Sequence, residues 1–289
     1  MDGVVHQGNR LRTQTIMTDE RDVTARGNYR TIPPTALAKD GADAFARIAP
    51  RWESCAVVGN SGSLLFSKYG KQIDAADVVL RINQVPAGGK YAPHVGSKTT
   101  IRVINRSWTL GYADNPDMNP KLRWSTWPHP LERGVSLLSL FSGPGNFMQL
   151  VRFMRGRLKK RSKDVALFYL NDAVYTRAKE ALAAHRKCYE LTRARPFKGG
   201  TTPSTGLVAL FLLRPMCKEL TLYGAGTESV AGMKYQYYQL QNTERERGNL
   251  FAHSFDAEMR VFMDMNRMGA VRFCGLKGCG QGPYTGSPV

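Results

Sequence analysis

Polar residues that follow apolar runs are the first candidates for site chemistry in this chain. Residues 55–58 form an apolar run that leads into a Gly-Asn-Ser-Gly turn at 59–62, and Asn83 and Asn105 each follow a similar run. Glycines let a backbone pass close to a phosphate, and backbone N–H groups in such a turn can bind an anion. Asparagine and serine side chains add hydrogen bonds that can read a sugar or a base. The pattern predicts a cradle for a nucleotide or a nucleotide sugar, with contacts from Asn60, Ser61, Asn83 and Asn105.

A second candidate site is the glycine- and hydroxyl-rich segment 197–206. It leads into the apolar run 207–216, which predicts a buried helix. A helix N-terminus offers free N–H groups and a dipole that stabilise an anion, so Ser204, Thr205 and Gly206 are candidate phosphate contacts. Ser204 or Thr205 as an ordinary N-cap accounts for the local pattern equally well.

His253 is the candidate general base. Imidazole exchanges a proton near neutral pH, which suits it to take one from a sugar hydroxyl. A histidine at a helix start is by itself more often structural, so His253 alone does not decide the chemistry. Glu258 is not a one-turn helical neighbour of His253. We expect Glu258 to organise the local helix or a nearby N–H group rather than to relay charge.

The stretch 55–100 resembles the large sialylmotif of the eukaryotic sialyltransferase family. The match runs in one register through Cys55, the turn at 59–62, the run 77–83 and the Val-Gly-Ser-Lys-Thr-Thr segment at 95–100. It is far more specific than a lone glycine fingerprint, and the Gly-x-Gly-x-x-Gly turn of a dehydrogenase does not occur here.

Three shorter segments resemble the other sialylmotifs, in the expected order. The matches are to the small motif at 203–206, 217 and 222–224, to the third motif at 235–239, and to the very small His-x4-Glu motif at 253–258. Gln236 stands where many members carry a histidine, which weakens the assignment of a phosphate-contacting histidine there. The four resemblances together cover residues 50–275.

The resemblance implies a donor, a reaction and a set of residues. Family members transfer sialic acid from CMP-sialic acid to a hydroxyl of an acceptor glycan on a glycoprotein or glycolipid, with inversion. His253 would be the base that deprotonates the acceptor hydroxyl. The donor-binding residues that the motifs imply are Asn60, Ser61, Asn83, Asn105, Ser204, Thr205, Gly206, Gly224 and Tyr237.

The resemblance also implies a disulfide, since Cys55 and Cys217 occupy the positions of the bond that joins the large and small motifs. Such a bond would place the domain in an oxidising lumen. Five cysteines leave at least one without an intrachain partner, and the pairing of Cys188, Cys274 and Cys279 stays open. Neither a metal site nor a cofactor beyond the donor is expected, because no Asp-x-Asp pair occurs and the cysteine spacing is not that of a metal site.

Strands and helices are expected to alternate along the chain. Apolar runs predict strands near 77–83, 99–105, 135–141 and 163–170, and helical patterns lie near 146–160, after a break at 143–145, and 172–189. Alternation predicts an α/β fold with a mainly parallel twisted sheet flanked by helices, Rossmann-like and of the glycosyltransferase-A-variant type. We expect one domain over 46–289, after a flexible arm or residual stem at 1–45. The segment 106–130 is expected to be a surface loop packed by its tryptophans, which could shape an acceptor groove.

Charge and hydropathy limit the partners. The 289 residues include 41 basic and 23 acidic ones, for a net charge of +18, so the surface should attract anions such as a CMP-sugar. Nucleic acid is not expected, because the basic residues are dispersed without a recognised motif. No run approaches the roughly 18 to 20 apolar residues of a spanning helix, and the first residues lack a secretory core. The resemblance implies the Golgi lumen or membrane, with membrane association only through an anchor absent from this chain.

Three alternatives remain open at this point. A transferase that uses CMP-Kdo would keep the same CMP cradle and differ around the sugar. A non-catalytic glycan- or sugar-nucleotide-binding protein would keep the fold and lose the base. A nucleic-acid-binding protein would explain the charge but not the four ordered motifs.

Overall fold

The computed structural model describes residues 17–19, 52–118, 123, 131–140, 143–157, 165–170, 172–191, 196–225, 230–238 and 251–280. The chain divides into two compact units. One combines Met1–Arg51 with Thr99–Tyr175, and the other combines Trp52–Lys98 with Thr176–Val289. The expectation of one domain over 46–289 stays a prediction.

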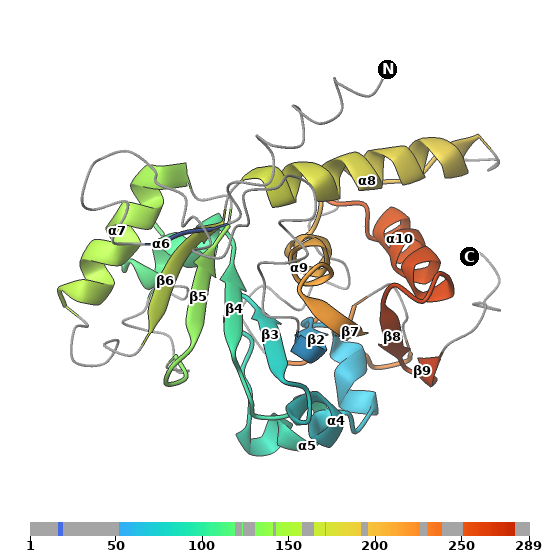
Figure 1. Cartoon of the computed structure of the whole chain (residues 1–289), viewed down its shortest axis with the longest axis horizontal. Helices are drawn as coiled ribbons and strands as arrows, with labels where there is room; N and C mark the ends of the chain where they lie inside the picture. Colours follow the sequence, from blue (N-terminus) through green and yellow to red (C-terminus); the bar gives the residue numbers. More distant parts are fainter. Residues whose placement is uncertain are drawn as a thin grey trace. The chain divides into compact units, whose positions relative to one another are not determined.

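The first unit is built on a sheet with the strand order β1-β6-β5-β4. Strands β4 (Ile101–Ile104), β5 (Ser136–Ser139) and β6 (Ala166–Leu170) are parallel, and β1 (Met17–Asp19) is antiparallel to β6. Helix α6 (Arg106–Tyr112) follows β4, and α7 (Gly143–Arg155) follows β5 (Figure 1). One stripe of α7 is buried at the spacing expected of an amphipathic helix, through Phe147, Leu150, Val151 and Met154.

Three local expectations for this unit are wrong. Residues 106–112 form α6 instead of a loop because Asn105 caps it: the Asn105 side chain accepts a hydrogen bond from the Trp108 N–H at 3.1 Å, and Trp108 is buried. Helix α7 begins at Gly143, inside the expected break. Met17–Asp19 pair with β6 although an irregular arm was expected, since a sheet edge offers N–H and C=O groups to any extended segment. Trp124, Trp127 and the rest of 1–45 lie outside the described residues.

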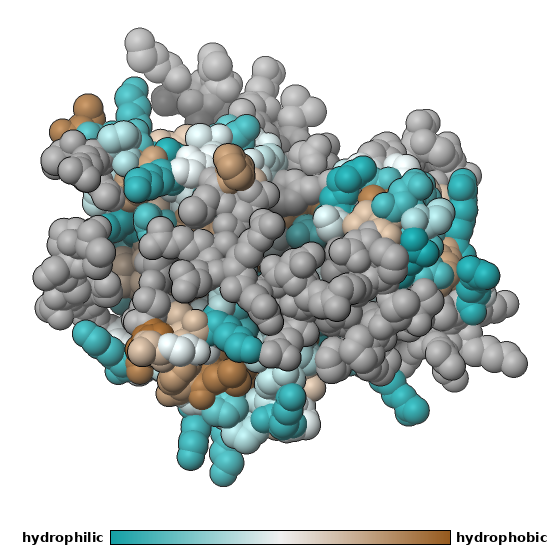
Figure 2. All heavy atoms as spheres, turned by 180° about the vertical axis from the view of Figure 1, so that it is seen from behind, coloured by the Kyte–Doolittle hydropathy of each residue, from teal (hydrophilic) through white to brown (hydrophobic). Residues whose placement is uncertain are grey.

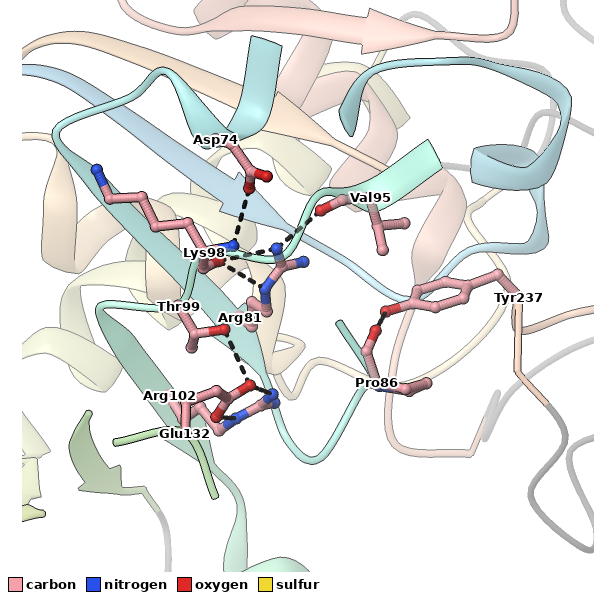
Figure 3. Close-up of polar contacts among 9 residues, drawn as sticks. All are labelled: Asp74, Arg81, Pro86, Val95, Lys98, Thr99, Arg102, Glu132 and Tyr237. Atoms are coloured by element: carbon pink, nitrogen blue, oxygen red, sulfur yellow. Dashed lines mark hydrogen bonds and ion pairs between the residues drawn. The ribbon is translucent and has the colours of Figure 1, made fainter. Parts of the chain in front are cut away.

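A buried ion pair fixes the beginning of β4 in this unit. The Arg102 side chain is 1% exposed and pairs with Glu132, which also accepts a hydrogen bond from the Thr99 hydroxyl at 2.9 Å (Figure 3). Burial by itself raises the pKa of the Glu132 carboxyl, but the hydrogen bonds and charge of Arg102 outweigh it and lower that pKa. The carboxylate is therefore held in the charged form that the buried arginine needs.

The second unit is built on a sheet with the order β3-β2-β7-β8-β9. Strands β2 (Trp52–Val58), β3 (Val78–Ile82), β7 (Cys217–Tyr223) and β8 (Arg272–Gly275) are parallel, and β9 (Gly278–Gly280) is antiparallel to β8. The remaining elements are η2 (Gly62–Phe66), α4 (Gly70–Asp74), η3 (Gly89–Tyr91), α5 (Ala92–Val95), α8 (Asp172–Glu190, mostly in this unit), α9 (Thr205–Leu213) and α10 (Phe255–Arg267). In Figure 1, α8, α9 and α10 lie above this sheet and α4 and α5 lie below it.

The core of this unit explains why its elements form. Helix α9 is apolar on nearly all sides and packs on β2, β3 and β7, which buries it almost completely. Strand β3 is buried along its whole length, as expected of a parallel strand covered on both faces. Parallel strands and covering helices in both units confirm the predicted α/β class with a mainly parallel sheet.

The exposed surface of the described residues is mixed. Figure 2 shows hydrophilic and hydrophobic side chains interspersed on the face seen from behind. Among the large apolar side chains that remain exposed, Leu65 and Phe66 belong to η2. None of the helices within the described ranges is long and apolar enough to cross a membrane.

Two disulfides lie in the second unit. Cys55 in β2 bonds Cys217 in β7 with a Cα–Cα separation of 6.0 Å, which confirms the predicted pair. Cys274 bonds Cys279 across the β8–β9 hairpin, and Cys188 on α8 is free and exposed. The Cys55–Cys217 bond ties the strand before the 59–62 turn to the strand after α9.

We expect the Cys55→Ala/Cys217→Ala variant to unfold at a lower denaturant concentration than the parent. The bond spans 162 residues of sequence, so its loss frees a long loop in the unfolded chain and should cost about 2 to 5 kcal/mol. Urea denaturation followed by circular dichroism measures this. Cys188→Ala is the matched control and should change little. Equal midpoints for the double variant and the parent would contradict the expectation.

Candidate functional site

Parallel pairing brings three predicted site segments to one edge of the second unit's sheet. Val58 of β2 pairs with Arg81 of β3 on one side and with Tyr223 of β7 on the other. Asn60, Asn83 and Gly224 each follow these positions by one or two residues. Ligands of such sheets bind outside the carboxyl ends of the strands, so this edge is the candidate site.

The turn at 59–62 is shaped by close backbone packing. Three of its four N–H groups are already used: those of Gly59, Ser61 and Gly62 donate to the carbonyls of Tyr223, Gly224 and Tyr235 at 2.8, 3.2 and 3.1 Å. A Cβ at Gly59 would lie 2.2 Å from the Gly224 carbonyl oxygen, so glycine is required for this approach. The expectation that the N–H groups of this turn face an anion is therefore wrong for Gly59, Ser61 and Gly62, and for Asn60 it stays a prediction.

Side chains, by contrast, remain available in this turn. The Asn60 side chain makes no hydrogen bond within the described part of the chain, although the Asn60 carbonyl accepts from the Tyr237 N–H at 3.1 Å. The Ser61 hydroxyl accepts from the Ser63 N–H at 3.2 Å and still has a proton to donate. Asn60 and Ser61 are therefore the residues of the turn whose side chains can contact a ligand.

Asn83 is held in a rare backbone conformation at the end of β3. Its φ of +53° lies in the left-handed region, which non-glycine residues rarely adopt and which occurs often at functional sites. Arg81, fully buried, donates to the carbonyls of Val95 at 2.7 Å and Lys98 at 2.9 Å. Asp74 in turn accepts from the Lys98 N–H at 2.9 Å (Figure 3). These contacts fix β3 immediately before Asn83.

Tyr237 fixes the chain on the other side of Asn83. Its hydroxyl donates to the Pro86 carbonyl at 2.6 Å, and its ring is 3% exposed (Figure 3). In this structure Tyr237 therefore orders the segment after β3, and a direct contact with the donor stays a prediction. Gln236 lies beside Ser61 through an antiparallel bridge.

The N-terminus of α9 combines an N-cap with open donors. The Ser204 hydroxyl accepts from the Leu207 N–H at 3.2 Å, which confirms Ser204 as the N-cap. The N–H groups of Thr205 and Gly206 have no partner within the described residues. A Cβ on Gly206 would lie 3.4 Å from Ile82 of β3, so this helix end adjoins the end of β3. The arrangement offers two N–H groups and a helix dipole to an anion.

Glu258 locks α9 to α10. Its carboxylate is 1% exposed and accepts from the Ser204 N–H at 2.7 Å and from the Ser204 hydroxyl. Burial raises the pKa of the Glu258 carboxyl to about 7, although the Ser204 hydrogen bonds oppose that shift. The expectation that Glu258 organises a nearby N–H is confirmed.

His253 is oriented by the segment that precedes α9. Its Nδ1 lies 2.8 Å from the Thr202 carbonyl oxygen, and the Thr202 N–H donates to the Ala252 carbonyl at 3.0 Å. A carbonyl can only accept, so in the neutral imidazole Nδ1 carries the proton and Nε2 keeps its lone pair. Nε2 has no partner within the described residues. This is the form that a general base requires.

Segments 198–204 and 251–258 together form what we call the paired loops. Besides the contacts of His253 and Glu258, the Ser254 hydroxyl donates to the Lys198 carbonyl at 2.6 Å. A Cβ on Gly200 would lie 2.4 Å from the carbonyl oxygens of Phe251 and Ala252, so the two backbones touch. The paired loops therefore carry the candidate base and the helix N-terminus as one body.

Most predicted site residues lie in the second unit, and one does not. Asn60, Ser61, Asn83, Ser204, Thr205, Gly206, Gly224, Tyr237 and His253 belong to it. Asn105 belongs to the first unit, where its side chain caps α6, and its donor contact stays a prediction. Sequence reasoning missed the supporting role of Arg81, although a charged residue inside an apolar run was a visible signal. No group of three or more metal-binding side chains occurs among the residues that the structure describes.

A parallel sheet edge, a helix N-terminus and an oriented histidine together suit an enzyme that transfers a group from a nucleotide-bound donor. The profile of glycosyltransferase family 29 (sialyltransferase) matches residues 17–270, and the chain belongs to this family. The predicted family is therefore confirmed.

Curated relatives are similar over most of this chain. An alpha-N-acetyl-neuraminyl-2,3-beta-galactosyl-1,3-N-acetyl-galactosaminide alpha-2,6-sialyltransferase of Mus musculus is 28% identical, over 72% of this chain and 58% of its own length. Sialyltransferase-like protein 3 of Oryza sativa subsp. indica is also 28% identical, over 81% and 62%. A beta-1,6-galactosyltransferase of Arabidopsis thaliana is 27% identical, over 74% and 51%. The chain thus spans between half and two thirds of these relatives.

A solved structure supports the fold. The crystal structure of a mammalian sialyltransferase in complex with Gal-beta-1-3GalNAc-ortho-nitrophenol has a TM-score of 0.53. It is 21% identical in sequence, and the match covers 83% of this chain and 76% of that one. At this identity the likeness establishes the shared fold.

The raised pKa of Glu258 predicts how stability depends on pH. Between about pH 4.5 and 7 the carboxyl stays protonated in the folded protein but ionises in the unfolded chain, so the unfolded chain binds fewer protons. The free energy of unfolding should therefore fall as the pH rises through this window, by up to about 3 kcal/mol. Denaturation midpoints at several pH values measure it.

Glu258→Gln should remove most of this slope because glutamine does not ionise and can still accept from the Ser204 N–H. Glu180→Gln, at an exposed position of α8, is the matched control and should keep the parent's slope. A Glu258→Gln profile that follows the parent at every pH would show that Glu258 does not titrate as described.

Proposed function

We propose that this chain transfers sialic acid from CMP-sialic acid to a hydroxyl of an acceptor glycan, without a metal and with inversion of the anomeric centre. The observation that carries the proposal is the state of His253. Its Nδ1 is engaged by the Thr202 carbonyl, and its Nε2 has no partner among the described residues, on the loops that also carry the N-terminus of α9. Membership of a sialyltransferase family supports the choice of sugar.

The proposed reaction needs little beyond positioning and charge. The Nε2 of His253 takes the proton of an acceptor hydroxyl while the hydroxyl oxygen bonds to the anomeric carbon. The bond between that carbon and the CMP oxygen breaks, and CMP leaves with the electron pair. The N–H groups of Thr205 and Gly206 and the dipole of α9 stabilise the phosphate as it departs, in place of a metal ion. Inversion follows because attack and departure occur on opposite faces.

The remaining donor contacts in this proposal come from side chains at the sheet edge. The Asn60 amide at the sheet edge has no partner within the described residues, and Asn83 is held beside it, so both suit the polar edges of a nucleotide. The rest of the predicted donor set is Ser61, Asn105, Ser204, Gly224 and Tyr237. The acceptor is a glycan of a glycoprotein or glycolipid, and the compartment we propose is the Golgi, where an oxidising lumen would maintain the Cys55–Cys217 bond.

The donor has to be tested directly because a galactosyltransferase is among the similar proteins. The purified protein is incubated with CMP-sialic acid, CMP-Kdo or UDP-galactose, each with a panel of galactosides and in the presence of EDTA. We expect release of CMP and a sialylated product whose anomeric configuration is opposite to that of the donor. Transfer from CMP-Kdo or UDP-galactose alone would replace the proposed donor, and CMP binding without transfer from any donor would favour a binding protein.

His253→Ala should lower kcat by about 10²- to 10⁴-fold, the usual contribution of a positioned base. CMP affinity should stay close to that of the parent because the N–H groups of Thr205 and Gly206 are unchanged. Steady-state kinetics and calorimetric CMP titration measure the two quantities. His185→Ala, on α8, is the matched control and should keep the parent's kcat. A kcat for His253→Ala equal to the parent's across several pH values would remove the base from the mechanism.

Asn60→Ala should weaken CMP binding about 2- to 10-fold, the cost of one lost neutral hydrogen bond. The fold should be unaffected, because the Asn60 side chain has no partner within the described chain. Calorimetric titration with CMP measures the effect. Asn115→Ala removes an asparagine of the first unit whose amide donates to Gln149, and it should leave the affinity unchanged. An unchanged CMP affinity in Asn60→Ala would exclude the contact.

A further inference from the structure

Arg186, in the last turns of α8, makes a concentrated set of contacts to residues 197–200, at the start of the paired loops. Its guanidinium donates to the carbonyls of Phe197 at 3.2 Å, Gly199 at 3.3 Å and Gly200 at 2.7 Å. The Arg186 side chain is 14% exposed, and an ion pair with Glu190 at 3.6 Å fixes it further. The Glu190 carboxylate in turn accepts from the Phe197 N–H at 3.3 Å.

These contacts have a clear physical reason. Residues 197–200 lie outside every strand and helix of the described chain, and a half-buried carbonyl without a hydrogen bond is costly. Arginine presents five donors in a rigid fork and can therefore serve several carbonyls at once. Gly199, at a φ of +91°, allows the turn that directs these carbonyls to one side chain.

The clamped segment reaches His253 through a short series of contacts. Gly200 lies against the carbonyls of Phe251 and Ala252, so its position sets how closely the paired loops approach. Two residues later, the Thr202 N–H donates a hydrogen bond to the Ala252 carbonyl, and the Thr202 carbonyl accepts one from Nδ1 of His253. Displacement of 199–200 therefore moves the carbonyl that selects the His253 tautomer.

We propose that Arg186 is a positioning residue that keeps the imidazole of His253 in the form with Nδ1 protonated and Nε2 open. The inference rests on the proposed function only in giving His253 a catalytic purpose. Arg186 acts through Phe197, Gly199 and Gly200 and touches no reacting atom in this account. The tautomer of His253 can be measured without any sugar transfer.

The test compares Arg186→Met and Arg186→Lys with Lys187→Met. Methionine keeps the apolar stem and removes every donor, whereas lysine keeps the charge and can serve one or two of the carbonyls. Lys187 is the adjacent exposed residue of α8, so Lys187→Met controls for charge and helix effects. Nitrogen-15 spectra of the imidazoles, with the His253 signals identified by their loss in His253→Gln, report the protonated nitrogen.

We expect the parent and Lys187→Met to show His253 with Nδ1 protonated, and Arg186→Met to show a mixture with the Nε2-protonated form. The kcat of Arg186→Met should fall about 10- to 100-fold, as expected for loss of alignment from a distance, with KM for the donor nearly unchanged. Arg186→Lys should lie between the parent and Arg186→Met in both the His253 tautomer and kcat. If Arg186→Met does not fold, the tautomer is measured in Arg186→Lys instead.

The outcomes separate the two claims. An unchanged tautomer in Arg186→Met, or in Arg186→Lys if only that variant folds, overturns the positioning role, whatever happens to kcat. A shifted tautomer with an unchanged kcat upholds the positioning role and contradicts His253 as the base. A shifted tautomer together with a lower kcat supports both.

Discussion

The hydrogen bonds between Ser204 and Glu258 are the interaction on which the site depends. Ser204 does three things at once: it caps α9 and gives both its N–H and its hydroxyl proton to the buried carboxylate. That carboxylate belongs to the first turn of α10, immediately after His253. One side-chain pair thus fixes the N-terminus of α9 relative to α10 and to His253, which precedes α10. Together with the other contacts of the paired loops, this pair holds the candidate phosphate contacts and the candidate base in one arrangement.

Several features around this pair lower stability while they hold the geometry. Glu258 is buried where its charge is disfavoured, and Asn83 adopts a left-handed backbone. Compensation comes from the apolar helix α9 in the core and from the Cys55–Cys217 bond beside it. Stabilising contacts far apart in sequence therefore support a costly arrangement at the sheet edge, as is common at functional sites.

The sequence predicted the α/β class, most strands, the disulfide and the segments that meet at the site, because apolar runs and motif order are local signals. It did not predict why the glycines of the 59–62 turn are needed: Gly59 accommodates the Gly224 carbonyl, which lies on another strand. It also placed residues 106–112 in a loop: the Asn105 cap is a local signal that was overlooked, whereas the burial of Trp108 depends on tertiary packing. The contacts of Arg186 join positions whose proximity no local pattern reveals.

The central claim is that the donor phosphate binds at the N-terminus of α9 with the open nitrogen of His253 facing the anomeric carbon. A crystal structure of the protein with a non-hydrolysable CMP-sialic acid analogue tests it most directly. Phosphate oxygens should lie within about 3.2 Å of the Thr205 or Gly206 amide nitrogen. Nε2 of His253 should point to the face of the sugar opposite the phosphate. A phosphate bound away from α9, or His253 on the same face as the leaving group, would contradict the account.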